Sequence, residues 1–230
     1  MRLRNNESGN IGFVAVAIII GLVIGFAAAR VMDNNKDTNT SSTASVPTSS
    51  TKAADLRSNL VTLGVEHMML TDQAIDGALD NSPNASATAA ALYGNGNDIG
   101  AAVGSVYGSD AEKTFDSVWK LHLDQFVKYA VADSKSDEAG KKAALDAISI
   151  GYTKPLSQYL AKANPNLPEA TLESVLGDHV AMTAQMIDDH VAGKYADEAA
   201  ELKQANQHIA GIFSTLAGGI VKQYPAKFQD

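Results

Sequence analysis

A ten-residue stretch occurs twice in this chain, and its two copies start 112 residues apart. Residues His67 to Asp76 read HMMLTDQAID and residues His179 to Asp188 read HVAMTAQMID, so five of the ten positions are identical. A third histidine, His122, lies 55 residues after His67 and 57 residues before His179. A repeat of this length is typical of tandem helical hairpins, which pack together because no single unit can bury its own apolar face.

Apolar residues recur with helical periodicity from residue 53 to residue 230. The first stripe has spacings of three and four and contains Leu56, Leu60, Leu63, His67, Leu70 and Ala74. Turn sequences then separate six helices, and they lie at residues 81–83, 107–109, 134–137, 164–168 and around Gly193. The segment from Ser109 to Glu112 resembles a capping box and predicts the start of the third helix. Because no segment alternates apolar and polar residues as a strand does, the predicted fold class is all-α, a six-helix up-and-down bundle built from three tandem helical hairpins.

An uncharged apolar run, IGFVAVAIIIGLVIGFAAA, occupies residues 11–29. Its length is close to the roughly 20 residues that a helix needs to cross a membrane. Arg2 and Arg4 precede it, so the positive-inside rule predicts a cytoplasmic segment 1–10, a transmembrane signal-anchor at 11–29 and a C-terminal domain outside the cell membrane. The alternative is a signal peptide cleaved near Ala29, which would release a secreted protein.

The remaining composition restricts the class of partner. Residues 30–52 are rich in Ser, Thr and Asn, and they predict a disordered linker before a helical bundle at 53–230. A net charge of -8 without any basic stripe argues against binding of nucleic acid. Since the chain has no cysteine, any metal ligands must come from His, Met, Asp or Glu.

Three histidines are candidate ligands because they lie on the apolar stripes of alternate helices. His67, His122 and His179 each lie about three turns into helices that should run in the same direction, so their imidazoles should share one level. Three inward histidines at one level could bind zinc or copper, with Met182 or Met69 as an extra soft ligand for copper(I). They could also ligate a haem.

A structural role for these histidines is the alternative. A histidine on an apolar face is often a core residue that is hydrogen-bonded to a neighbour, and a repeat copies such packing as readily as it copies a ligand. His208 lies beside the last apolar stripe and is a weaker candidate. His190 follows two aspartates near a helix end and is expected to be solvated.

Glycine and proline mark two further features. Glycine stands at positions 94, 96, 100, 104 and 108, and this spacing predicts close approach of another helix to the second helix. Pro155 predicts a kink in the fourth helix or its first turn. Signatures of catalysis are missing, because the sequence contains neither the Glu-x-x-His pairs of di-iron bundles nor His-Glu-x-x-His nor Gly-x-Ser-x-Gly.

A family resemblance rests on residues spread from about Ala53 to Phe228. They are Glu66-His67, Tyr107-Gly108, Phe115, Trp119, His122, Asn164 to Leu167, His179, His208 and Pro225 to Phe228. With these residues the chain resembles uncharacterised bacterial extracytoplasmic helical domains, some of which carry the label "copper amine oxidase". The Asn-Tyr-Asp/Glu motif of those enzymes is absent from this sequence. The resemblance therefore implies a location and a helical fold, without an activity.

The sequence thus favours a membrane-anchored extracytoplasmic helical domain that binds an unknown ligand without catalysis. No cofactor is predicted on this interpretation, and the membrane is a partner through residues 11–29. The alternative is an envelope protein that binds copper, zinc or haem through its core histidines.

Overall fold

The computed structural model describes residues 51–229. The predicted cytoplasmic segment, the signal-anchor and nearly all of the linker lie outside these residues. Within the described part, no helix combines the length and the apolar character that crossing a membrane requires. The first helix begins at Lys52, one residue before the expected start of the bundle, and the Thr51 hydroxyl caps it by accepting a hydrogen bond from the Ala54 amide.

The described residues form six helical rods and no strand. The helices are α1 (Lys52–Leu79), α2 (Ala85–Tyr107), α3 (Ser109–Asp133), α4 (Glu138–Ile148), α5 (Lys154–Ala163), α6 (Glu169–Val191) and α7 (Tyr195–Gln223), with a π-helical turn η1 (Ser149–Thr153) and a 3-10 turn η2 (Pro225–Phe228). Because α4, η1 and α5 follow one another without a break, they count as one rod. The predicted all-α class and the number of helices are confirmed.

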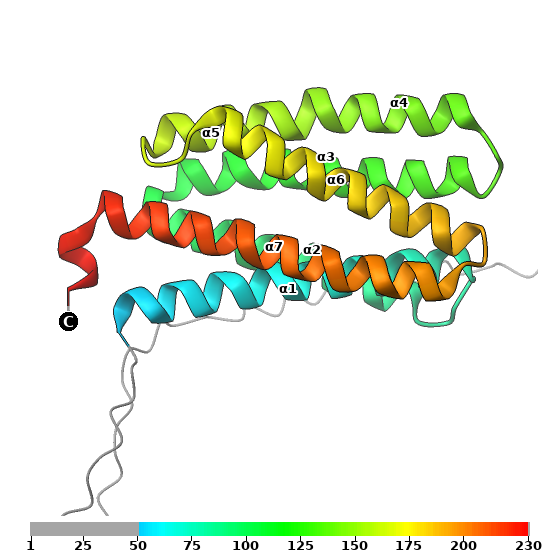
Figure 1. Cartoon of the computed structure of the whole chain (residues 1–230), viewed down its shortest axis with the longest axis horizontal. Helices are drawn as coiled ribbons and strands as arrows, with labels where there is room; N and C mark the ends of the chain where they lie inside the picture. The colour runs from blue at the N-terminus through cyan, green and yellow to red at the C-terminus, as the bar shows by residue number, and fades with distance from the viewer. Residues whose placement is uncertain (1–50, 230) are drawn as a thin grey trace, which may run out of the picture. The chain divides into compact units, whose positions relative to one another are not determined.

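Consecutive rods run in opposite directions and lie lengthwise against one another (Figure 1). Every predicted turn falls at a junction between helices. Two of these junctions use glycine in the left-handed region, with φ of 93° at Gly108 and 69° at Gly193. As a result α1, α3 and α6 share one direction, which places their midpoints beside each other.

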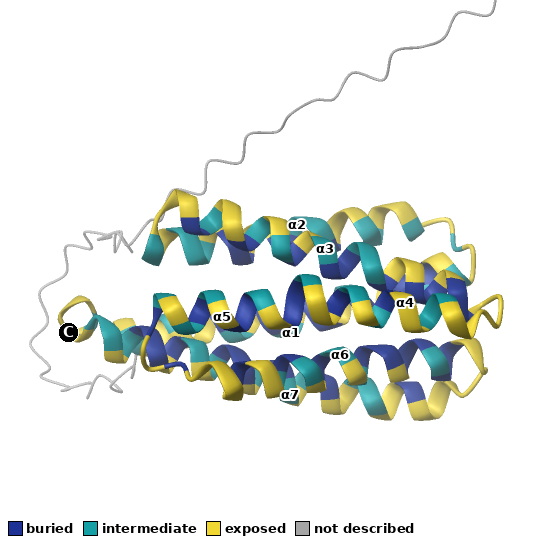
Figure 2. Cartoon of the chain, turned by 90° about the horizontal axis from the view of Figure 1, so that it is seen from above, coloured by how far each residue is buried: buried dark blue, intermediate teal, exposed yellow. Residues whose placement is uncertain are grey.

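One apolar core runs through the bundle. Buried residues follow the inner faces of the helices, and exposed residues follow the outer faces (Figure 2). The aromatic residues of the core come mainly from α3, where Phe115, Trp119, Phe126 and Tyr129 are all buried. These four residues follow the apolar stripe of the third helix, so the periodicity of the sequence identified this part of the core.

The π-helical turn η1 has a local cause. Pro155 lies in the first turn of α5, directly after η1, and it offers no amide hydrogen to the carbonyl of Gly151 four residues earlier. Widening the preceding turn relieves the clash between the proline ring and that carbonyl. The widened turn carries Tyr152 into the core, where it is buried.

Close approach of α2 and α3 depends on glycine, as the spacing predicted. A Cβ atom at Gly96, Gly100 or Gly104 would collide with a side chain of α3. The side chains in question belong to Trp119, Asp116 and Glu112 respectively. Gly94 instead faces open space, and Gly108 ends the helix.

The predicted capping box from Ser109 to Glu112 is wrong. Helix α3 begins at Ser109 with Gly108 as its N-cap, and no side chain caps it. The Glu112 side chain lies against Gly104 of α2. Packing between the two helices therefore overrides the local cap.

A partly buried ion-pair network joins α3, α4 and α6. The Lys141 ammonium lies 2.6 Å from Asp133 and 2.9 Å from Asp188, and the Tyr129 hydroxyl donates to Asp188 at 2.7 Å. Asp188 is the last residue of the second copy of the repeat. In the second copy of the repeat, Asp188 is therefore held by Lys141 and Tyr129.

Candidate metal sites

His67 of α1, His122 of α3 and His179 of α6 meet in the middle of the bundle. Their ring centroids are 5.6, 5.9 and 6.5 Å apart in pairs, and each residue is 1% exposed. One potential ligand atom of each ring lies within 4.8 Å of the others. The predicted convergence at one level is confirmed.

Aromatic side chains pack against two of the three imidazoles, those of His67 and His122. The His122 ring stacks on Tyr152, with centroids 4.2 Å apart and planes 20° apart. Trp119 lies 4.9 Å from His67 and 4.7 Å from His122. Tyr152 reaches this position through the π-helical turn, and Trp119 reaches it because Gly96 leaves room beside its indole ring.

Most of the ring nitrogens lack a hydrogen-bond partner among the described residues. Both nitrogens of His122, both of His179 and Nδ1 of His67 are buried without one. A neighbouring amide, Asn95 of α2, donates to the Leu63 carbonyl at 3.1 Å and to the Glu66 carboxylate at 3.2 Å. Five unpartnered imidazole nitrogens in one place depart from the rule that buried polar groups are satisfied.

Burial keeps all three imidazoles neutral. It lowers the pKa of His67 to about 3, with His179 adding to the shift and Asn95 opposing it. Burial likewise lowers the pKa of His179 to about 4, with a further contribution from His208. The pKa of His122 is held well below its usual value by burial, and then by His67 and His179, while the Trp119 backbone opposes the shift. At neutral pH each ring therefore keeps a free lone pair.

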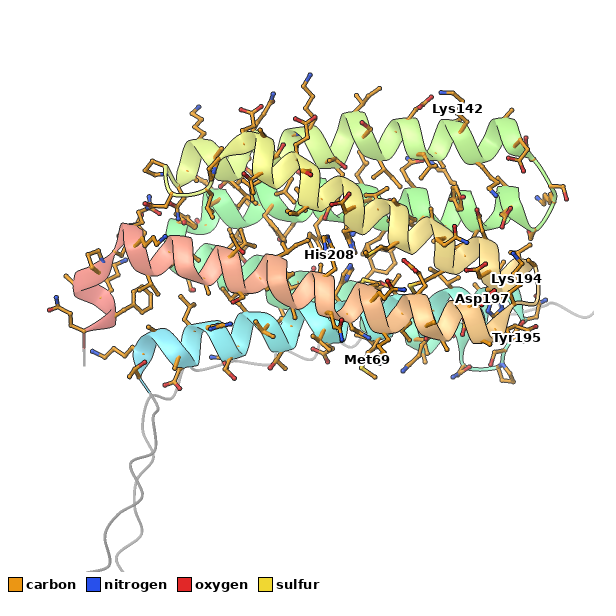
Figure 3. The ribbon with its side chains drawn as sticks, viewed as in Figure 1. Met69, Lys142, Lys194, Tyr195, Asp197 and His208 are labelled. Carbon is orange, nitrogen blue, oxygen red and sulfur yellow. The ribbon has the colours of Figure 1, made fainter. Side chains whose placement is uncertain are left out.

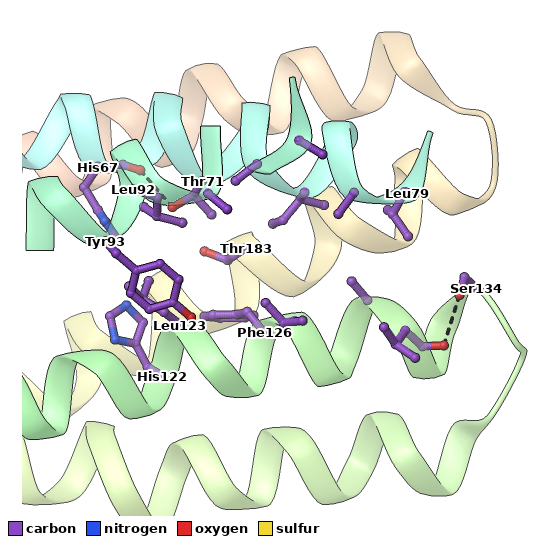
Figure 4. A pocket seen from close by; sticks show the side chains of 18 of the residues that line it. His67, Thr71, Leu79, Leu92, Tyr93, His122, Leu123, Phe126, Ser134 and Thr183 are labelled. Carbon is purple, nitrogen blue, oxygen red and sulfur yellow. Dashed lines mark hydrogen bonds between the residues drawn. The ribbon is translucent and has the colours of Figure 1, made fainter. Parts of the chain in front are cut away.

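A cavity of about 410 Å³ lies beside the three rings, between α1, α2, α3 and α6 (Figure 4). Its walls are mostly apolar and include Leu92, Leu123 and Phe126. Val127 and Val131 also line the cavity, and both are exposed to solvent. The imidazoles thus supply much of the polarity of an otherwise apolar pocket, which is the usual character of a ligand site.

Two buried threonines reproduce the repeat in the structure. The Thr71 hydroxyl donates to the His67 carbonyl at 2.8 Å, and the Thr183 hydroxyl donates to the His179 carbonyl at 3.0 Å. Both threonines line the cavity next to their histidines. The two copies therefore place the same histidine and threonine pair at the same pocket.

The predicted methionine ligands are placed differently from the histidines. Met69 is 47% exposed and points outward from α1, so its proposed role is wrong (Figure 3). Met182 is partly buried and packs against the core, and it does not line the cavity. His208 donates through Nε2 to the Val175 carbonyl at 2.9 Å, which is a structural role.

His190 is buried and not solvated, in contrast to the prediction. It is 6% exposed, because Asp76 of α1 and Asp80, which directly follows α1, approach it from one side and Glu198 of α7 covers it from another. With Asp76 and Glu198, it forms a second group whose ligand atoms lie within 4.8 Å of each other. Sequence reasoning missed this group, although the four-residue spacing of Asp72, Asp76 and Asp80 places three carboxylates on one face of a helix.

Comparisons of the chain with protein-family models, with curated proteins and with solved structures found no match in any of the three. The resemblance to bacterial extracytoplasmic helical domains therefore stays a prediction.

Proposed function

We propose that this domain binds a transition-metal ion, copper(I) or zinc, through His67, His122 and His179. The observation that carries the proposal is the convergence of five unpartnered imidazole nitrogens in a fully buried place. A buried polar atom without a partner costs about 1–3 kcal/mol. An ion bound by one nitrogen of each ring would offset part of that cost, and neutral imidazole is the form that ligates a metal.

The dimensions of the site are compatible with such an ion. Three nitrogens at 2.0–2.1 Å from a common ion are about 3.3–3.6 Å apart. The ligand atoms now lie within 4.8 Å of one another, so binding requires the rings to approach by at most about 1.5 Å. The adjoining cavity leaves one coordination position open to a small ligand.

Charge favours copper(I) over zinc. The three ligands are neutral and the group contains no carboxylate, so every charge on the ion stays uncompensated in apolar surroundings. Copper(I) carries one charge and zinc carries two. Haem fits less well, because the third imidazole occupies the space into which the macrocycle would extend.

The hydrogen bonding of the second ring nitrogens differs from that of most metal-binding histidines. Ligating histidines normally donate their second ring N–H to a carboxylate or a carbonyl. Neither nitrogen of His179 has such a partner among residues 51–229. The Trp119 backbone lies near His122 and favours its protonated form, but no hydrogen bond of good geometry joins them. Stacking against Tyr152 and Trp119 supplies the orientation of His122 instead.

Titration of copper(I) into the full chain, in competition with a chromogenic chelator, tests the proposal. We expect one bound ion per chain and an affinity at least tenfold lower in His122→Gln, about 1.4 kcal/mol, because one of three bonds is lost. His208→Gln is the matched control and should bind as the wild type does. Equal affinity in His122→Gln and the wild type would contradict the proposal.

We also propose a location for the domain, outside the membrane, and an architecture of three tandem hairpins. The apolar run at residues 11–29 supports an anchored protein with the bundle outside the membrane, and a cleaved, secreted form is the alternative. Retention of the full chain in membranes washed with carbonate supports the anchor, whereas mature protein starting near Arg30 supports cleavage. The matching histidine and threonine pairs of α1 and α6 support three tandem hairpins.

A further inference from the structure

We propose a second metal site, for a divalent cation such as zinc or manganese(II), formed by His190, Asp76 and Glu198. It lies at the end of the bundle where α6 ends and α7 begins, the end at which Lys194, Tyr195 and Asp197 are seen (Figure 3). Three helices contribute one ligand each, because Asp76 belongs to α1, His190 to α6 and Glu198 to α7. The site shares no residue with the three central histidines.

The two separations between His190 and the carboxylates match those of ligands on a common ion, and all three ligand atoms lie within 4.8 Å of one another. His190 Nδ1 lies 3.0 Å from Asp76 Oδ1 and 3.0 Å from Glu198 Oε1. Two atoms that are each about 2.1 Å from an ion, in directions at right angles, are about 3.0 Å apart. Binding therefore needs little movement of these side chains.

Among the described residues, the hydrogen bonds within this group leave one carboxylate oxygen, Asp76 Oδ1, without a partner. A single Nδ1–H cannot donate well to two carboxylates at once, and Asp76 Oδ1 is a buried atom without a hydrogen bond despite its 3.0 Å distance from the ring. Glu198 is itself buried. An ion at the centre of the group would contact both carboxylates and the ring nitrogen together.

The other ring nitrogen of His190 is already supported as in a metal site. Nε2 lies 3.3 Å from Asp80 Oδ1, so an Nε2–H donor leaves the lone pair of Nδ1 directed at Asp76 and Glu198. A carboxylate that accepts from the second nitrogen is the usual device for orienting a ligating histidine. Asp80 is thus a positioning residue, and it is 61% exposed.

The charge of this region calls for a cation of more than one charge. Asp76, Asp80 and Glu198 surround a single imidazole, and none of the described ion pairs brings a lysine or arginine to Asp76 or Glu198. Lys194, the nearest basic residue along the chain, lies 3.8 Å from Asp189.

The ligand set indicates the class of ion. One imidazole and two carboxylates suit zinc and manganese(II), whereas copper(I) prefers softer ligands. The two proposed sites should therefore select different metals. Zinc or manganese(II) binding here would also tie α1 to α6 and α7 at their shared end.

Binding of zinc and of manganese(II), each alone, to full-length His122→Gln protein tests this second site. In that background the central site is weakened by the loss of one ligand, and the dependence of binding on Glu198 assigns the ion to the second site. We expect one equivalent of metal per chain and a higher melting temperature with metal than without. Adding Glu198→Gln should lower the affinity at least tenfold and abolish the thermal shift.

Asp197→Asn is the matched control, since Asp197 is the exposed neighbour of Glu198 and its substitution removes the same charge. It should leave the affinity unchanged. If Glu198→Gln fails to fold, Asp80→Asn replaces it, and it should weaken binding without affecting the helical circular dichroism signal. No stoichiometric binding in His122→Gln, or equal losses in Glu198→Gln and Asp197→Asn, would overturn the proposal.

Discussion

His122 and His190 are both buried, yet their surroundings are opposite in character. His122 lies among aromatic rings and two other imidazoles, and neither of its nitrogens makes a hydrogen bond of good geometry within the described chain. His190 lies among three carboxylates, with both nitrogens engaged. Burial alone would keep either ring neutral, so the neighbours decide which of the two can carry a charge.

The two pKa shifts follow from this difference. Burial, and then the neighbouring histidines, hold the pKa of His122 far below its usual value. Burial also acts to lower the pKa of His190, but Asp76, Asp80 and Glu198 together outweigh it, and the pKa is raised. The central site therefore offers neutral ligands, whereas the terminal site offers a histidine within a negatively charged group.

The largest effect is expected from substituting His190→Phe in the metal-free protein. The change leaves Glu198 buried, and Asp76 partly buried, without a cationic partner, and breaking a buried pair costs about 3–5 kcal/mol. The free energy of unfolding from urea denaturation, measured with a chelator present, checks this loss. A loss below 1 kcal/mol would mean that His190 does not neutralise these carboxylates.

The same substitution at His122 should act in the opposite direction. His122→Phe removes two unpartnered ring nitrogens and keeps an aromatic ring against Tyr152, and the cavity beside it gives room for the larger side chain. Without metal, the free energy of unfolding should rise by about 1–3 kcal/mol. Copper(I) binding should be lost in the same variant. Destabilisation instead would indicate that the ring nitrogens are satisfied in the native protein.

The fold and the convergence of the central histidines were predictable because both follow from periodicity. Apolar spacing defined the helices, and short turns forced neighbouring helices to alternate in direction. Equal depth in three helices of the same direction then brought His67, His122 and His179 together. The cap at Ser109 failed for a tertiary reason, since Glu112 packs against α2.

The terminal site was not predictable from the repeat, because equivalent positions have different partners. Asp76 faces His190 and Glu198, whereas Asp188, its counterpart in the second copy, pairs with Lys141 and Tyr129. Burial of His190 depends on how the start of α7 folds back over α6. The sequence around His190 does not indicate that α7 covers it. His190 was therefore predicted to be solvated, although it is buried.

The smallest of the expected effects is the dependence of these two substitutions on pH. His122 titrates near pH 6.5 in the unfolded chain and well below that in the folded one, so between these values only the unfolded chain binds the proton. The stability advantage of His122→Phe over the wild type should therefore grow as the pH falls below about 6.5, by about 1.4 kcal/mol per pH unit.

The folded pKa of His190 is raised, so its contribution to the free energy of unfolding is complete below about pH 6.5 and is lost as the pH rises through the folded value. The penalty of His190→Phe should accordingly shrink as the pH rises. Urea denaturation of metal-free wild type and both variants from pH 5 to 8 gives the two slopes, and slopes of the same sign would remove the contrast between the two sites.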